Sequence, residues 1–207
     1  MRLYIKGDYT KEIPFDYLEL AKKMWFENYQ GESIPLSYSG FRQIRDRNDI
    51  AIHLKLDKQD YDERWLHIPI QEGIKYRFYS QIDEDLNLEF EHAYITDFRE
   101  NGDCLRLIST HLELLTLDKR AFYIMAIEIA TIFNGQISED DKKTWITIDE
   151  FKEKHEDILS LTFEEANEMS LEEIQMIDAI DDPIWEELDR KREEYIKIHG
   201  ERVYDDD

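Results

Sequence analysis

Carboxylates are the side chains of this sequence best able to do chemistry, as general acids or bases, as ligands of divalent ions, or as partners of a basic protein. Two clusters stand out, Glu139–Asp141 and Asp178–Asp182. Neither has the alternate oxygen ligands, central glycine and closing glutamate of an EF-hand loop. Adjacent Asp140 and Asp141 would bind a divalent ion only weakly, and a hairpin tip with aspartates bonded to local amides explains them more simply. We therefore expect no metal and no other cofactor.

Motifs for other catalytic chemistry are missing from the sequence. No glycine-rich phosphate loop and no GxSxG elbow is present, and a single cysteine excludes a cysteine-ligated zinc site. Ser109, Thr110 and His111 bring a hydroxyl near an imidazole, but neighbouring residues of a strand point to opposite faces. The histidines form no HExxH pair, and we expect three of them on strands: His53, His67 and His92. We therefore expect a protein that is not an enzyme.

The composition describes a folded, strongly acidic chain. Its 207 residues are 42% hydrophobic, which is enough for a core, and its net charge is −23. Such a charge repels nucleic acid and anionic membranes and suits either a basic protein partner or simple solubility. Cys104 cannot form an internal disulfide, and we find neither a signal peptide nor a stretch of transmembrane length. We expect a cytoplasmic protein and make no prediction of its oligomeric state.

The stretch Thr116–Trp145 should organise the fold. Within Ala121–Phe133 only Glu128 is charged, so a helix here must be covered by other parts of the protein on most sides. Such a helix is too short to cross a bilayer. Asn134-Gly135 should end this helix, with the glycine in the left-handed C′ position. The polar residues that follow form a tip, and the chain returns to the body at Trp145.

The residues before this helix predict an α+β fold. Arg2–Lys6 favours a strand, and apolar residues at helical spacing after Pro14 favour a helix that ends near Gly31. Alternating apolar residues indicate further strands at Ile50–Leu54, Tyr76–Phe78 and Leu86–Phe90. We expect an antiparallel sheet of four to six strands with the central helix packed on it.

Asn101-Gly102 is typical of a type I′ hairpin turn. A two-residue loop there would place Phe98 opposite Leu105, and the further pairs would be Asp97 with Arg106 and Ile95 with Ile108.

The C-terminal part is more acidic and is predicted to be helical. Residues 136–207 hold 25 of the 49 acids and 9 of the 26 bases. Thr147-Glu150, Thr162-Glu165 and Ser170-Glu173 have the spacing of capping boxes, and Asp182-Pro183 resembles a helix start. We divide the chain into an α+β core domain, 1–146, and an acidic helical region, 147–207, that packs on the core or extends from it.

The four tryptophans allow two interpretations. They can anchor the core, or they can be exposed as anchors for a partner, because tryptophan is favoured at binding hot spots. Trp145 and Trp185 each lie beside acidic residues and are the two best candidates for the second role.

The stretch AIEIATIFNGQISEDDKKTWITIDEFKEKH contains three features in succession. An apolar helix ends at Gly135, an acidic tip with Asp140, Asp141 and Trp145 follows, and a capped T-x-x-E-F helix comes last. This stretch of about 30 residues resembles a feature of small acidic immunity proteins from bacterial toxin–immunity systems. The resemblance implies a protein that binds a toxin and blocks its site without chemistry of its own.

Our first hypothesis is a non-catalytic immunity-type inhibitor of a basic toxin or nucleic-acid-binding enzyme, with no direct contact to nucleic acid or membrane. Its candidate binding residues are Glu139, Asp140, Asp141, Trp145, Asp181, Asp182 and Trp185. One alternative is a phage or plasmid DNA mimic, whose carboxylates would follow the spacing of duplex phosphates. Another is an enzyme of unrecognised type, which would need a deep pocket with carboxylates and a histidine.

Overall fold

The structure is a computed structural model of the chain. It describes residues 1–9, 16–26, 35–40, 51–68, 82, 84–91, 104–111, 113–176, 190, 191, 193, 194, 196 and 197. Two compact units divide the chain, Met1–Ile177 and Asp178–Asp207. The first unit contains every strand described below and the helices up to η4 (Ile174–Met176).

The first unit is built on a six-stranded antiparallel sheet in the order β2-β3-β4-β5-β1-β6. The strands are β1 (Arg2–Lys6), β2 (Leu36–Gly40), β3 (Ala51–Leu56), β4 (Leu86–Glu91), β5 (Cys104–Ser109) and β6 (Gln136–Ser138). The first strand has the predicted bounds, and the alternation in β4 places Leu86 and Leu88 in the core. The predicted α+β class with an antiparallel sheet is confirmed.

The register of β5 differs from the one that the sequence suggested. Leu105 lies opposite Phe90 of β4 and opposite Ile5 of β1, so both of its edges are occupied and its predicted pairing with Phe98 is wrong. Arg106 and Ile108 likewise face β4 residues, Glu89 and Asn87. The Asn101-Gly102 turn and the Tyr76–Phe78 strand lie outside the described residues.

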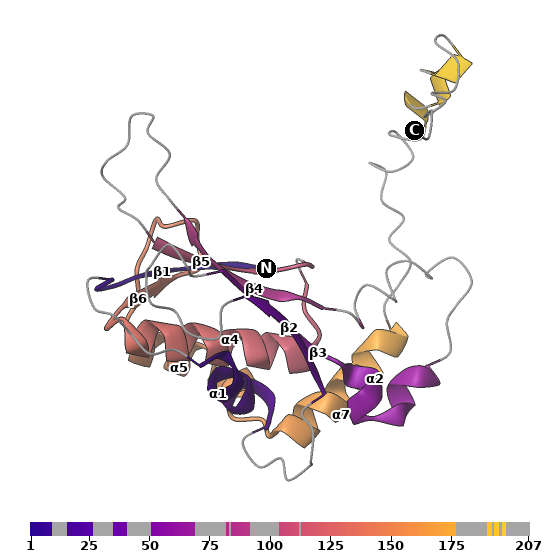
Figure 1. Ribbon diagram of the computed structural model, residues 1–207, viewed down its shortest axis with the longest axis horizontal. Helices are drawn as coiled ribbons and strands as arrows, with labels where there is room; N and C mark the ends of the chain where they lie inside the picture. Colours follow the sequence, from indigo (N-terminus) through magenta and orange to yellow (C-terminus); the bar gives the residue numbers. More distant parts are fainter. Residues whose placement is uncertain are drawn as a thin grey trace. The chain divides into compact units, whose positions relative to one another are not determined.

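The apolar helix α4 (Thr116–Ile132) contacts β1, β5 and β6, and also η1 and the helices α5, α6 and α7. Figure 1 shows α4 running along the sheet, with α1, α5 and α7 on the same side of the sheet. Its buried residues include Phe122, Met125 and Ile129, which join the main core.

The end of α4 corrects one prediction. Asn134 takes the left-handed conformation at φ 47°, and Gly135 donates its N–H to the Ala130 carbonyl at 2.8 Å. This is a Schellman motif with Asn134 at C′ and Gly135 one residue later. A Cβ at Gly135 would lie 2.4 Å from the Lys6 carbonyl oxygen, so the glycine permits close approach of β1 to the helix end.

The first predicted helix is helical over residues 17–26. Asp16 caps α1 (Tyr17–Ala21) by accepting the Leu18 N–H at 2.9 Å, and the helix continues as a π-helical turn, η1 (Lys22–Phe26). Trp25 and Phe26 are buried there. The predicted boundaries at Pro14 and Gly31 lie outside the described residues. Between β3 and β4 lie α2 (Lys58–Tyr61) and the 3-10 turn η3 (Glu63–Leu66).

Two of the three predicted capping boxes are present. Thr147 with Glu150 begins α5 (Ile148–Lys154), which α6 (Glu156–Leu159) follows, and Thr162 with Glu165 begins α7 (Phe163–Glu173). The third box is wrong because Ser170 and Glu173 lie at the end of α7. The Asp182-Pro183 start lies outside the described residues.

Ser170 and Glu173 instead cap the start of α4, whose own N-cap residue, Leu115, provides no side-chain bond. The Ser170 hydroxyl accepts the Leu117 N–H at 2.7 Å, and a Glu173 oxygen accepts the Thr116 N–H at 2.7 Å. The first turn of a helix has free N–H groups, and here another helix satisfies two of them. This contact fixes α7 against α4.

None of the helices in the described ranges is both long enough and apolar enough to span a membrane.

Candidate functional site

The acidic tip predicted as a binding site is a β-hairpin whose aspartates serve the turn. Ile137 and Ile146 exchange backbone hydrogen bonds of 3.0 and 2.9 Å, and Asp141 and Lys142 between them have positive φ angles. Asp140 accepts the Thr144 N–H at 2.8 Å and the Thr144 hydroxyl at 2.7 Å. These bonds stabilise the ionised form and lower the pKa of Asp140 to about 2.

The other predicted residues of the tip also have contacts within the chain. Glu139 bonds Lys154 at 2.6 Å and His155 at 2.8 Å, which fastens the tip to the end of α5. Asp141 is exposed and lies 4.0 Å from Arg2. Trp145 is half-buried, and the Lys6 ammonium lies 4.6 Å from its ring centroid. The structure brings Glu139, Asp140, Asp141 and Trp145 together in the tip. Of the three carboxylates, only that of Asp141 is exposed and has no contact shorter than 4.0 Å with a cation among the described residues.

The remaining predicted site residues, Asp181, Asp182 and Trp185, lie outside the described residues. Trp25 and Trp65 are buried, and Trp65 donates its indole N–H to Asn167 at 3.0 Å, as expected of core anchors. Of the histidines expected on strands, His53 lies exposed in β3, whereas the prediction for His67 is wrong, because it follows the 3-10 turn η3. His92 is outside the described ranges.

Six exposed carboxylates of α5, α6 and α7 have no hydrogen bond or ion pair among the described residues: Asp149, Glu153, Glu156, Asp157, Glu164 and Glu172. The same helices carry only two lysines, and Lys154 is engaged by Glu139. An exposed charge without a counter-charge keeps its field directed at the solvent, where it can attract an oppositely charged molecule. This set, the α5–α7 acidic face, is the strongest candidate for a binding surface in the described residues.

A second group of charges is buried near the start of α4. Lys58 and Asp118 form an ion pair at 3.0 Å, and both side chains are almost completely shielded from solvent. Lys58 also donates to the Ile82 carbonyl at 2.9 Å. Burial raises the pKa of Asp118 to about 6, although the ammonium of Lys58 opposes that rise.

Glu84 and His111 complete this buried cluster. One Glu84 oxygen lies 2.5 Å from His111 Nδ1, and the other accepts the Thr110 N–H at 2.6 Å. The cluster therefore contains two carboxylates and a histidine, as the enzyme alternative requires, but each is bound by another group of the chain. In the part of the chain that the structure describes, no group of three or more His, Cys, Asp or Glu residues is placed to hold a metal ion.

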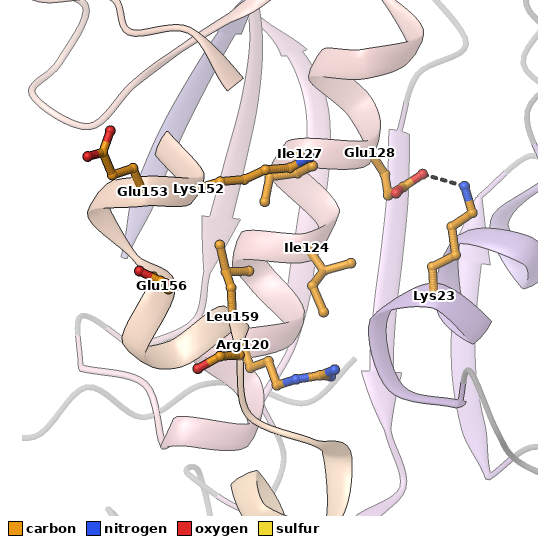
Figure 2. A pocket seen from close by; sticks show the side chains of 10 residues that line it. Lys23, Arg120, Ile124, Ile127, Glu128, Lys152, Glu153, Glu156 and Leu159 are labelled. Atoms are coloured by element: carbon orange, nitrogen blue, oxygen red, sulfur yellow. Dashed lines mark hydrogen bonds and ion pairs between the residues drawn. The ribbon is translucent and has the colours of Figure 1, made fainter. Parts of the chain in front are cut away.

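An open groove lies beside the acidic face, with a volume of about 730 Å³. Its floor is formed by Ile124 and Ile127 of α4 and by Leu159 of α6 (Figure 2). Arg120 closes one end: its guanidinium donates to the carbonyls of Leu161 at 2.7 Å and Met24 at 3.1 Å, which holds the two walls against α4.

Sequence reasoning missed both the buried cluster and the groove. The residues of the pair Lys58–Asp118 are far apart along the chain, and neither stands in a motif. The groove is formed by helices that meet only in the folded protein. A local signal existed for the acidic face, since Asp149, Glu153 and Glu156 are spaced on one side of a helical segment, away from buried Phe151.

No protein-family model matches the chain, and neither does any curated protein or solved structure.

Proposed function

We propose that this chain is a non-catalytic binding protein that neutralises a basic partner by direct contact, as an immunity protein neutralises a toxin. The supporting observation is the α5–α7 acidic face, whose six exposed carboxylates form no ion pair among the described residues. Complementary charge steers encounter and raises the association rate. A toxin that handles nucleic acid presents the basic cleft that such a face fits.

The tip takes a smaller part in this proposal than the sequence suggested. Glu139 and Asp140 are bound within the chain, so their charges are partly neutralised or fixed in a turn. Asp141 remains available at the exposed end of the hairpin. The carboxylates that can contact a partner are therefore mainly those of the helices. We propose that the protein works in the cytoplasm, a reducing compartment that suits its single cysteine.

The test is affinity capture from the source organism with the wild-type chain and a charge-reversed variant. The variant carries Glu153→Lys, Glu156→Lys, Glu164→Lys and Glu172→Lys, all at exposed positions. We expect the wild type to enrich a basic protein that the variant does not, and that protein to arrest growth unless the wild type is co-expressed. Capture of the same proteins by both chains would contradict the proposal. Release of DNA from a captured DNA-binding enzyme would favour the DNA-mimic alternative.

A further inference from the structure

The groove beside the acidic face has an apolar floor that is open to solvent. Ile124 and Leu159 are half-buried, and Ile127 is 7% exposed. Figure 2 shows the Lys152 side chain extending from α5 toward Ile127, where its aliphatic stem borders the floor. The volume of about 730 Å³ is sufficient for several large side chains from a partner.

The two walls of the groove differ in charge. On the η1 wall, Lys23 is paired with Glu128, and Lys22 is paired with Glu19 at 2.7 Å. On the α5–α6 wall, Glu153 and Glu156 have no partner among the described residues, and Figure 2 shows their carboxylates on the outer side, away from the floor. The charges of the η1 wall are therefore paired, whereas the α5–α6 wall carries two unpaired carboxylates and one lysine, Lys152, and is acidic on balance.

We propose that this groove docks an amphipathic helix of the basic partner, an inference that rests on the proposed function. The apolar side chains of that helix lie on Ile124, Ile127 and Leu159. Its Lys or Arg residues line the edge that faces Glu153 and Glu156. The unequal walls allow one orientation of the bound helix, because the reverse orientation leaves its cations beside the already paired Lys23.

A helix fits this groove better than an extended peptide does. An extended peptide gains affinity by adding its backbone to a sheet edge. The described lining comes from α4, η1, α5 and α6, and backbone groups within a helix already bond each other. A bound helix satisfies its own backbone and needs only an apolar floor and a charged edge, and both are present here.

The probe is a phage-displayed library of random peptides of about 16 residues, enough for about four helical turns. Selection against the full chain should enrich peptides with apolar residues at helical spacing and with Lys or Arg along one flank. Failure to enrich such peptides would overturn the proposal of the groove but not the proposed function, which capture of a basic protein tests separately.

Four variants then locate the binding of an enriched peptide. We expect Glu153→Lys/Glu156→Lys, Ile124→Ser and Leu159→Ser each to weaken it by about tenfold or more, since an apolar anchor or a close charge contributes about 1.4 kcal/mol or more. The matched comparison, Glu164→Lys/Glu172→Lys, makes the same change of charge on α7, whose residues do not line the groove, and should weaken binding less than Glu153→Lys/Glu156→Lys does. Circular dichroism checks that each variant is folded.

The groove would not be the docking site if both charge-reversed pairs lowered the affinity equally while Ile124→Ser and Leu159→Ser left it unchanged. The acidic face would then attract basic proteins in general. Indifference to all four variants would overturn the groove as well. If the captured basic partner also ignored both pairs, the proposed function would fail with it.

Discussion

The buried cluster around Asp118 and the α5–α7 acidic face use carboxylates in opposite ways. In the cluster, Asp118 and Glu84 are shielded from solvent and are bound by Lys58, His111 and backbone N–H groups. On the face, residues such as Glu153 and Glu172 are exposed and have no described partner. A net charge of −23 therefore does not by itself identify a binding surface, since only the second kind of carboxylate can meet another molecule.

Helix α7 combines both uses along a few turns. Ser170 and Glu173 point inward and cap α4, whereas Glu164 and Glu172 are exposed. Glu168 bonds Arg64 of η3 at 2.5 Å, an exposed pair. Substitutions of the inward groups should lower the stability of the fold, whereas substitutions of the outward groups should lower the association rate with a partner. The two regions can therefore be distinguished by experiment.

The largest expected effect comes from breaking the buried pair. Asp118→Ala leaves the Lys58 ammonium buried without its counter-charge, so we expect a loss of about 3–5 kcal/mol in the free energy of unfolding. Urea denaturation measures it. The double variant Lys58→Met/Asp118→Leu should recover most of that loss, because both charges are removed together. If Asp118→Ala lowered the free energy of unfolding no more than the exposed variant Glu172→Ala does, the distinction between the buried cluster and the acidic face would be wrong.

Ser170→Ala should cost less, about 1–3 kcal/mol, because it leaves the Leu117 N–H buried without an acceptor. Thermal or urea unfolding gives the value. Ser160→Ala is a suitable control, since Ser160 is exposed and has no side-chain bond among the described residues. If the two variants were equally stable, Ser170 would not be the cap of α4.

Thr147→Ala should cost about 0.5–2 kcal/mol, the usual range for an N-cap. Thr147 accepts the Glu150 N–H at 3.2 Å in the capping box of α5, which carries part of the acidic face. Thr147→Ser keeps the hydroxyl and should restore stability in the same unfolding assay. A loss in the serine variant as large as in the alanine variant would show that the methyl group matters and the cap does not.

Site-resolved NMR titration should separate Asp118 and Asp140 by pKa, about 6 against about 2, from the same ordinary value of 3.8. The consequences for stability have opposite signs. The stabilising contribution of Asp118 is present below pH 3.8 and is lost as pH rises through about 6. That of Asp140 is present above pH 3.8 and is lost as pH falls through about 2. Similar pKa values for the two carboxyls would contradict this assignment.

Local features of this fold could be predicted from the sequence. The strand Arg2–Lys6 and the boxes at Thr147 and Thr162 each depend on a few neighbouring residues, and each is present. Ser170-Glu173 has the same spacing as a capping box, but its hydroxyl and carboxylate bind α4, and spacing alone does not distinguish a local bond from a distant one. The register of β5 failed for the same reason, because its partners are set by tertiary packing.

The candidate site was predictable only in part. The sequence identifies the acidic residues, but whether each can bind a partner depends on which cations contact it in the folded protein. Lys154 and His155 bind Glu139, whereas no described residue binds Glu153. Similarly, the ion pair of Lys58 and Asp118 joins α2 to α4 and has no local signature.

The most direct test of the central claim is the association rate of the captured basic partner, measured over a range of salt concentrations. We predict that the variant with Glu153→Lys, Glu156→Lys, Glu164→Lys and Glu172→Lys associates about tenfold or more slowly at low salt and approaches the wild-type rate at high salt. Its free energy of unfolding should fall by no more than about 2 kcal/mol, because Glu156 and Glu164 lie in the first turns of α6 and α7, where a carboxylate contributes about 0.3–1 kcal/mol. Equal association rates at every salt concentration would contradict the claim that these unpaired carboxylates form the binding surface.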